Sequence, residues 1–310
     1  MDKLKPEPLA EGAKIGIVAP ASPLSATGEV EKAVDWLKKF GFRVVLGKST
    51  IPRNGYLAGS DQERLNDLEQ MWRNDSVAAV WCLRGGYGSL RLLPQLDYDY
   101  WARHPKILVG FSDITALELA LWSKIQLVTF HGPVLTMLGG AFSGRQALAI
   151  LSGQKCTGLL DWPANPSLPT LVTIRAGRAE GILLGGNLTT LVSLLGTPFF
   201  PDLKQAVLFI EEVNEAAYRV DRLLTQLRYS GALEQVAGIM IGRSIPISGE
   251  TEADLIAVFQ ERLGDLEVPV VYGWPVGHLE AQWTLPQGVM AEFDADSGNL
   301  QLREEPLALS

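Results

Sequence analysis

The sequence predicts an α/β protein with two domains, and three observations lead to this fold class. At 310 residues the chain is long for a single hydrophobic core. Short apolar runs rich in β-branched residues alternate with segments whose apolar residues recur at helical spacing. Between residues 153 and 169 periodicity fades and glycines and prolines gather: Gly153, Gly158, Pro163, Pro166 and Pro169. We therefore expect an N-terminal domain at residues 1–152, a linker at 153–170 and a C-terminal domain at 171–310.

The first domain is expected to consist of β-α-β units. Apolar runs predict strands at residues 14–19, 42–46, 77–83, 107–109 and 126–130, and helical spacing predicts helices at 30–40 and 61–72 and a third starting at Asp113. The triplet Gly47-Lys48-Ser49 resembles the end of a Walker A loop. However, five residues separate it from Gly41 where that motif has four, and no helical pattern follows. The sequence therefore argues against nucleotide binding there.

The second domain repeats the alternation of strands and helices. Its strands are predicted at residues 178–184, 206–210, 236–241 and 268–272, and its helices at 188–195, 216–227 and 252–263. The longest apolar region, residues 182–200, is interrupted by Gly185, Gly186, Asn187 and Pro198. A helix across a membrane needs an unbroken apolar stretch of about 20 residues, so this region is not expected to span one.

Composition and charge narrow the possible partners and location. The net charge is −8, and no cluster of lysine and arginine offsets it, which argues against nucleic acid or an anionic membrane as a partner. A small molecule or a peptide is expected instead. Residues 1–12 contain no apolar core of a signal peptide, so we expect a soluble cytoplasmic protein. The two cysteines fit a reducing compartment, and Cys82, inside an apolar strand, is expected in the core.

No metal or cofactor is expected. The chain has three histidines, His104, His131 and His278, which are far apart in the sequence, and it has no Cys-x-x-Cys pair.

The stretch of residues 106–121 is the first candidate for catalytic chemistry. An apolar strand ends at Gly110, which permits a sharp turn, and a helix is predicted to follow, which places Ser112 at the corner. A serine at such a corner projects its hydroxyl above the sheet edge, where the N–H groups of the next helix turn also point. The second glycine of the G-x-S-x-G motif is absent. The alternative is an ordinary serine that caps the helix.

A glycine cluster follows the preceding strand. Arg84-Gly85-Gly86-Tyr87-Gly88 begins where the strand at 77–83 ends, and open α/β sheets bind ligands at that edge. Its N–H groups can bind an anion, although a tight turn also accounts for glycines. We expect this loop to lie beside Ser112. His131, after the next strand, either enters the site or terminates that strand.

An activated serine needs a base and a third group that orients the base. Glu211 and Glu212 end an apolar run, and His278 lies in a loop rich in glycine and proline. The order Ser112, Glu211, His278 is also the order of serine, carboxylate and histidine in hydrolases with a nucleophile elbow. A surface glutamate and a loop histidine are the alternative interpretation.

Several ordered motifs resemble the LD-carboxypeptidase family, serine peptidase family S66. The resemblance extends from about residue 14 to residue 293, and its motifs are Gly16-Ile-Val-Ala-Pro-Ala-Ser-Pro23, Leu57-Ala-Gly-Ser-Asp61, Arg84-Gly-Gly-Tyr-Gly-Ser-Leu-Arg-Leu-Leu-Pro94, Val109-Gly-Phe-Ser-Asp-Ile-Thr115, His131-Gly-Pro133, Leu184-Gly-Gly-Asn-Leu188, Leu208-Phe-Ile-Glu211, and Pro275-Val-Gly-His278 with Thr284-Leu-Pro286. It implies a catalytic triad of Ser112, Glu211 and His278. It also implies an oxyanion hole formed by the backbone N–H groups of Gly86 and Asp113.

The resemblance also implies an architecture and a substrate. The expected fold is an N-terminal parallel-sheet domain like class I glutamine amidotransferases, which are flavodoxin-like, followed by a swivelling C-terminal β/α domain. The expected protein is a homodimer without a cofactor that removes the terminal D-alanine from cytoplasmic murein tetrapeptides during peptidoglycan recycling. Arg84, with Gly85 and Tyr87, is expected to bind the free carboxylate of such a peptide.

Two alternatives stay open. The microcin-immunity branch of the same family cleaves aminoacyl-nucleotide conjugates, and a binding protein with an inactive site is a different class. The segment of residues 279–283 is bulkier and more acidic than the small glycine-bearing loop expected there, which leaves the specificity of the pocket open.

Overall fold

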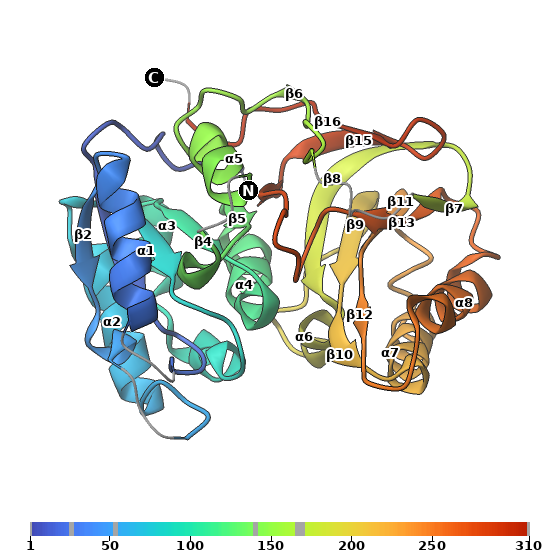
Figure 1. The fold of residues 1–310 in the computed structure, drawn as a ribbon, viewed down its shortest axis with the longest axis horizontal. Helices are drawn as coiled ribbons and strands as arrows, with labels where there is room; N and C mark the ends of the chain where they lie inside the picture. Colours follow the sequence, from blue (N-terminus) through green and yellow to red (C-terminus); the bar gives the residue numbers. More distant parts are fainter. Residues whose placement is uncertain (1, 25–27, 52–54, 139–141, 165–170, 309–310) are drawn as a thin grey trace.

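The structure is a computed structural model that describes residues 2–24, 28–51, 55–138, 142–164 and 171–308. Two β-sheets, each with its own helices, lie side by side (Figure 1). The first half of the chain forms most of one sheet, and the second half forms the other. The fold is therefore mixed α/β, as the sequence predicts.

The N-terminal sheet has the strand order β14-β5-β4-β3-β1-β2. Five of its strands are parallel: β1 (Lys14–Val18), β2 (Arg43–Leu46), β3 (Val77–Cys82), β4 (Ile107–Gly110) and β5 (Thr129–His131). The helices between and after them are α1 (Gly28–Lys39), α2 (Asp61–Arg73), α3 (Tyr98–Arg103), α4 (Thr115–Ile125) and α5 (Ser143–Leu151). The predicted strands and helices of this half are confirmed apart from small shifts of their ends. Cys82 is fully buried, as expected.

The strand predicted at residues 126–130 begins later, at Thr129. Gln126 closes α4 in a left-handed conformation, with φ at 53°. The backbone on either side of Leu127 then bonds to Leu4, whose N–H donates to the Gln126 carbonyl and whose carbonyl accepts from Val128. This apolar run therefore pairs first with the N-terminal segment and only then with β4.

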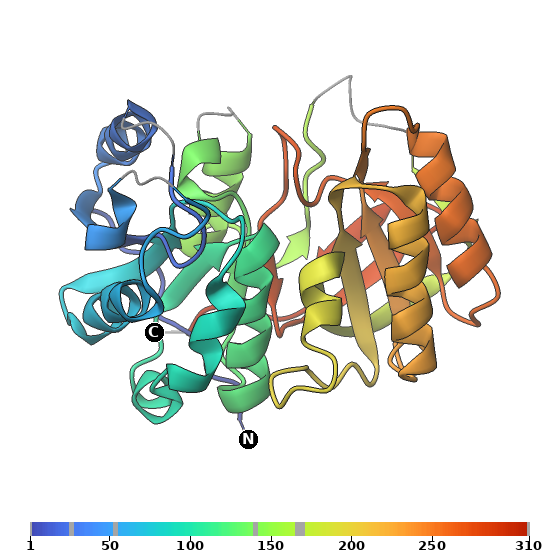
Figure 2. The same ribbon diagram turned by 90° about the horizontal axis from the view of Figure 1, so that it is seen from below.

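The C-terminal sheet has the order β6-β16-β15-β8-β9-β11-β13-β7. Its parallel centre contains β8 (Arg178–Asn187), β9 (Ala206–Glu211), β11 (Gly238–Gly242) and β13 (Val270–Trp274). Antiparallel strands flank it: β6 (Gly158–Leu159), β7 (Val172–Arg175), β15 (Met290–Asp294) and β16 (Asn299–Leu302). The helices are α6 (Leu188–Ser193), α7 (Ala217–Tyr229) and α8 (Glu252–Leu263), of which α7 and α8 pack side by side (Figure 2). A separate short pair joins β10 (Val213–Glu215) to β12 (Ile245–Pro246).

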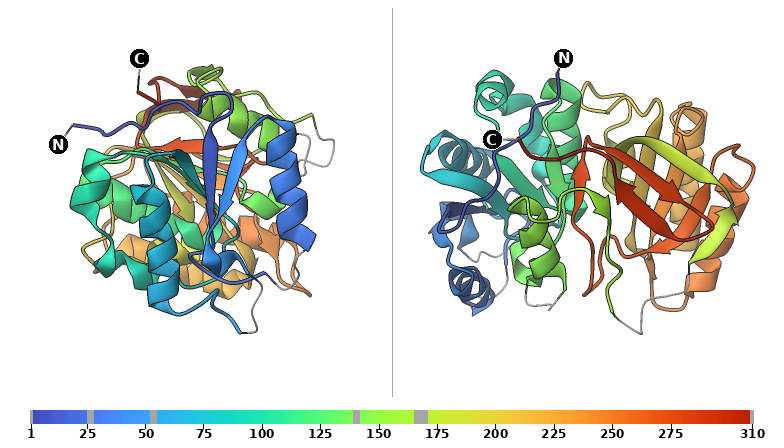
Figure 3. Two further views of the ribbon diagram at one scale, coloured as in Figure 1. Left: turned by 90° about the vertical axis from the view of Figure 1, so that its left-hand side faces the viewer. Right: turned by 90° about the horizontal axis from the view of Figure 1, so that it is seen from above.

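The two halves are interwoven beyond a single linker. β14 (Leu285–Gln287), from the last part of the chain, adds an antiparallel edge strand to β5 in the N-terminal sheet. Conversely, β6 lies within the predicted linker and pairs with β16 of the C-terminal sheet. Segments near the two ends of the chain also run close together (Figure 3), and the Ala308 N–H donates to the Pro6 carbonyl. Each sheet therefore contains a strand from outside the stretch of sequence that the predicted domain boundaries assign to it.

In the described part of the chain, no helix combines the length and apolar character needed to cross a membrane.

Candidate active site

Ser112 occupies a strained corner between β4 and α4. Its φ is 63°, a left-handed conformation that residues other than glycine adopt only at an energetic cost. A short 3₁₀ turn, Ser112–Ile114, leads into α4, and the residues that cap these two elements are Phe111 and Ile114. The interpretation of Ser112 as an ordinary helix cap is therefore wrong. Backbone strain at this point is the property expected of a nucleophile elbow.

Glycines allow the neighbouring backbone to approach this corner closely. A Cβ atom added to Gly85 would lie 2.9 Å from the Ser112 Cβ, and one added to Gly110 would lie 2.6 Å from the Ile114 Cγ2. Both distances are shorter than side chains tolerate. Since β3 and β4 are adjacent parallel strands, the glycine loop and Ser112 lie at the same sheet edge, which confirms that part of the prediction.

Glu211 and His278 meet in the C-terminal half. Glu211 is the last residue of β9 and is buried, and its Oε2 lies 2.7 Å from the Nδ1 of His278, in the loop after β13. Space for this pair depends on Gly277, whose φ is 97° and where an added Cβ would lie 2.5 Å from the same carboxylate oxygen. The pairing selects Glu211, rather than Glu212, as the partner of His278.

The imidazole of His278 also contacts the serine corner. The ring of Phe111, the residue before Ser112, has its centroid 4.7 Å from that of His278. The structure therefore brings the serine corner of the first half together with the histidine and carboxylate of the second.

The His278–Glu211 contact changes the pKa of both groups. Burial acts to lower the pKa of His278, but the hydrogen bond to Glu211 and the negative charges of Glu211 and Glu212 outweigh it, so the pKa lies above the ordinary 6.5. Burial acts to raise the pKa of Glu211, but the hydrogen bond from His278 and the charges of His278 and His131 hold it below 4.5. The carboxylate is therefore ionised at neutral pH.

Glu212, which follows the end of β9, has a different environment from Glu211. Its carboxylate accepts hydrogen bonds from the Asn187 side chain at 3.0 Å, from the Thr189 N–H at 3.0 Å and from the Thr189 hydroxyl at 2.7 Å. Burial and the charge of Glu211 raise its pKa above 4.5. Glu212 thus holds the start of α6 in place.

A pocket of about 310 Å³ opens beside Ser112. Its walls come from both halves: Gly86, Tyr87 and Asp113 on one side, and Asn187, Glu212 and Glu215 on the other. Sequence reasoning missed the contribution of α6 and β10. The motif Leu184-Gly-Gly-Asn-Leu188 was the available signal, because Asn187 ends β8 and caps α6.

Of the remaining candidate residues, Tyr87 lines this pocket, whereas Arg84, Gly85 and His131 lie outside its walls. The Arg84 guanidinium donates to the Pro23 carbonyl at 2.9 Å, and Gly85 packs beneath Ser112. Tyr87 lines the pocket, is about half exposed, and pairs with the ring of Tyr56 at 6.0 Å between centroids. His131 ends β5, is buried, and has its Nδ1 3.2 Å from the Glu118 carboxylate.

The segment of residues 279–283 packs into the protein and lines no part of the Ser112 pocket. The Gln282 N–H donates to the Ser143 hydroxyl at 2.9 Å, and the Trp283 indole donates to the Asp161 carbonyl at 2.8 Å. Its bulk therefore has a structural role at the junction of the two halves.

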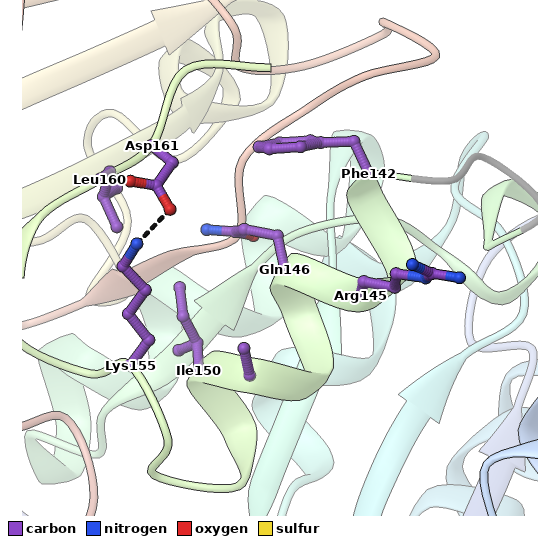
Figure 4. Close-up of a pocket in the computed structure, with 8 residues that line it drawn as sticks. Phe142, Arg145, Gln146, Ile150, Lys155, Leu160 and Asp161 are labelled. Carbon is purple, nitrogen blue, oxygen red and sulfur yellow. Dashed lines mark hydrogen bonds and ion pairs between the residues drawn. The ribbon is translucent and has the colours of Figure 1, made fainter. Parts of the chain in front are cut away.

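A second pocket, of about 280 Å³, lies between α5 and the segment that follows it (Figure 4). Phe142, Ile150 and Leu160 supply apolar walls, and an ion pair joins Lys155 to Asp161. It shares no lining residue with the Ser112 pocket. Across the described ranges, no three histidine, cysteine, aspartate or glutamate side chains gather as a metal site would require.

Comparison with known proteins identifies relatives over nearly the whole chain. The sequence model of the LD-carboxypeptidase N-terminal domain matches residues 15–132, and that of the LD-carboxypeptidase C-terminal domain matches residues 180–293. A probable murein peptide carboxypeptidase of Bacillus subtilis is 37% identical over 293 residues, which cover 94% of this chain and 91% of that protein.

Solved structures of two relatives superimpose closely. The microcin C7 self-immunity protein MccF, known from Escherichia coli, matches with a TM-score of 0.89 at 28% identity, covering 98% of this chain and 100% of the other. It has also been solved in complex with aspartyl sulfamoyl adenosine. A muramoyltetrapeptide carboxypeptidase from Oxalobacter formigenes matches with a TM-score of 0.79 at 31% identity, covering 94% and 98% of the two chains.

Proposed function

The chain belongs to the LD-carboxypeptidase family, serine peptidase family S66, and we propose that it removes the terminal D-alanine from murein tetrapeptides. The bond cleaved is the amide between an L-centre, diaminopimelate or lysine, and D-alanine. We place this activity in cytoplasmic peptidoglycan recycling, carried out by a homodimer whose N-terminal half is like the class I glutamine amidotransferases. The observation that carries the proposal is the buried Glu211–His278 pair against the strained Ser112 corner.

In the proposed mechanism Ser112 is the nucleophile and His278 its base. Glu211 accepts the Nδ1 proton of His278, which leaves Nε2 free to accept the proton of the serine hydroxyl. The Ser112 Oγ attacks the carbonyl carbon of the L-centre and forms a tetrahedral intermediate. Its collapse breaks the C–N bond, and His278 returns the proton to the nitrogen of the departing D-alanine. Water, deprotonated by His278, then hydrolyses the acyl-enzyme.

The negative charge of the intermediate falls on the former carbonyl oxygen. We assign its stabilisation to the N–H groups of Gly86 and Asp113, which both line the pocket beside Ser112.

Charged groups in and beside the Ser112 pocket suit the two charged parts of the proposed substrate. Arg84 uses one nitrogen of its guanidinium for Pro23, and its other N–H groups, with the Gly85 and Tyr87 loop, are proposed to bind the terminal carboxylate. Glu212 and Glu215 line the opposite side, and their negative charge complements the side-chain amino group of diaminopimelate or lysine.

The experiment is incubation of the purified protein with L-Ala-γ-D-Glu-meso-diaminopimelyl-D-Ala. Loss of one alanine residue, seen by mass spectrometry, is the expected result, and Ser112→Ala is the negative control. Peptides with an amidated C-terminus or with terminal L-alanine should react far more slowly. A parallel incubation with an aminoacyl sulfamoyl nucleoside measures the microcin-type alternative, and cleavage of that compound alone would replace our proposal.

A further inference from the structure

We propose that the side chain of Asp113 is a positioning group that aligns the two halves of the oxyanion hole. This inference rests on the proposed function, because it concerns the assigned donors at Gly86 and Asp113. Those donors belong to different loops, which follow β3 and β4. The two N–H groups stabilise a transition state best if both already point at the same position when charge develops. The two loops must therefore be held in a fixed position relative to each other.

The Asp113 carboxylate bonds directly to the glycine loop. One oxygen, Oδ2, accepts the Ser89 N–H at 2.8 Å, and the other, Oδ1, accepts the Gly88 N–H at 3.3 Å. The backbone carbonyl of Asp113 accepts the Ser89 hydroxyl at 2.5 Å. The residue that supplies one donor of the hole therefore binds the loop that supplies the other, through three hydrogen bonds.

These hydrogen bonds are protected from water. Asp113 is 7% exposed and Ser89 is fully buried. Burial of both partners prevents water from replacing these hydrogen bonds. The carboxylate can therefore fix the loop more firmly than an exposed contact could.

Arg64 and Ser22 also bond to the same loop. Arg64, which is fully buried, donates from Nη1 to the Gly88 carbonyl at 2.9 Å. The hydroxyl of Ser22 accepts the Tyr87 N–H at 3.1 Å, and the Ser22 N–H donates to the Gly85 carbonyl at 3.4 Å. Both peptide groups of Gly88 are thus fixed.

The backbone N–H of Gly86 differs from those of the residues that follow it in having no hydrogen-bond partner within the described part of the chain. Its N–H has no hydrogen-bond partner among the residues that the structure describes, whereas those of Tyr87, Gly88 and Ser89 are each bonded. Its φ of 115° and an added Cβ that would lie 2.3 Å from the Ser22 hydroxyl oxygen restrict this position to glycine. The loop is held on both sides of one free donor, and that arrangement points to oxyanion binding at Gly86.

The first test is steady-state kinetics of Asp113→Asn with the murein tetrapeptide. An amide side chain accepts one N–H but presents its own NH₂ group to the other, so the loop loses part of its anchor without a change of volume. We expect kcat to fall about 10- to 100-fold with KM nearly unchanged, since removal of one oxyanion donor costs about 10²- to 10³-fold.

The matched control is Asp67→Asn. Asp67 is another buried carboxylate of the same sheet unit, on α2, and it accepts hydrogen bonds from the N–H and hydroxyl of Ser49, outside the walls of the Ser112 pocket. It should lower the melting temperature and leave kcat close to that of the unmodified protein. If Asp113→Asn keeps full kcat, or if both variants lose activity only in proportion to lost stability, the positioning role is wrong.

A second readout separates this inference from the choice of substrate. A fluorophosphonate reacts with an activated serine, and its P=O oxygen occupies the oxyanion hole during the reaction. Its rate with Ser112 should fall in Asp113→Asn by a factor similar to the fall in kcat. If the unmodified protein reacts with this probe but does not cleave the peptide, the proposed substrate is wrong. The probe rates of Asp113→Asn and Asp67→Asn then still decide the role of Asp113. If the unmodified protein reacts with neither, both proposals are wrong.

Discussion

The Nδ1 of His278 lies 2.7 Å from the Oε2 of Glu211, and this contact determines which nitrogen of the imidazole is available for proton transfer. A buried carboxylate accepts a hydrogen bond only from a protonated nitrogen, so the neutral ring carries its proton on Nδ1. Nε2 is then the free acceptor. The ring is further held by the Phe111 side chain next to Ser112.

The first prediction concerns strain at Ser112. Both Ser112→Ala and Ser112→Gly should lower kcat by about 10⁴-fold or more, because the nucleophile is lost. Only glycine relieves the cost of a φ of 63°, so Ser112→Gly should be more stable than Ser112→Ala by about 1 kcal/mol. Urea unfolding of the two variants measures this difference. Equal stabilities would mean that the corner carries no strain.

The second prediction is that Glu211 and His278 act as one unit. Glu211→Gln and His278→Ala should each reduce kcat strongly, and the double variant should lose little more than His278→Ala alone, because the carboxylate acts only through the imidazole. Kinetics of the four proteins provide the double-mutant cycle. Additive losses would show that Glu211 has a separate role.

The third prediction is the pH dependence of activity. Only neutral His278 can accept the serine proton, so kcat/KM should fall as the pH decreases through the pKa of that group, which lies above 6.5. In Glu211→Gln the negative charge that raises this pKa is absent, and the residual activity should show its inflection at lower pH. An unshifted inflection would assign the titration to another group.

The same pair links pH to stability. The pKa of His278 is raised in the folded protein. Its contribution to the free energy of unfolding is therefore complete below the unfolded pKa near 6.5, and it is lost as the pH rises through the folded pKa. The pKa of Glu211 is lowered in the folded protein. Its contribution to the free energy of unfolding is therefore present above about pH 4.5, the unfolded pKa, and it is lost as the pH falls through the folded pKa. The free energy of unfolding of Glu211→Gln should therefore differ most from that of the unmodified protein between these limits.

Local signals in the sequence were sufficient to place the serine corner. A β-branched run, a glycine and a helical period around Ser112 are all short-range features, and the structure has a strand, a corner and a helix there. The neighbouring glycine loop could be placed because consecutive parallel strands of a β-α-β unit tend to be adjacent. Pairing Glu211 with His278 depended on their order in the chain and on the family resemblance, since neither residue carries a local pattern of its own.

Contacts between segments far apart in the chain could not be predicted from the sequence. β14 has three residues, too few for a periodic pattern, and its partner β5 is more than a hundred residues earlier in the chain. The pocket wall formed by Asn187 and Glu212 depends on how β8 and β9 end side by side, which composition does not reveal. For the same reason the predicted linker contains a strand, β6, whose partner β16 lies near the C-terminus.

The last prediction concerns the polar contacts that join the two sheets. Gln287 of β14 accepts the Gly185 N–H at 3.0 Å and donates to the Glu118 carboxylate at 2.8 Å, and the same carboxylate oxygen lies 3.2 Å from the Nδ1 of His131. Gln287, Glu118 and His131 are all fully buried, so water cannot replace a lost partner. Gln287→Leu, which keeps a similar volume, leaves a buried N–H and a carboxylate without that partner, and each such group costs about 1–3 kcal/mol.

We therefore expect Gln287→Leu to lower the free energy of unfolding by about 2–5 kcal/mol, measured by urea denaturation. Gln146→Ala is the matched control, because Gln146 also joins the two halves, accepting the Thr284 N–H at 2.7 Å, but it is partly exposed and water can take its place. Gln146→Ala should lower the free energy of unfolding by about 1 kcal/mol. Because β14 is shared, both halves should unfold in one transition followed by tryptophan fluorescence and by circular dichroism. Two separate transitions, or equal costs for the two variants, would contradict a buried polar junction between the sheets.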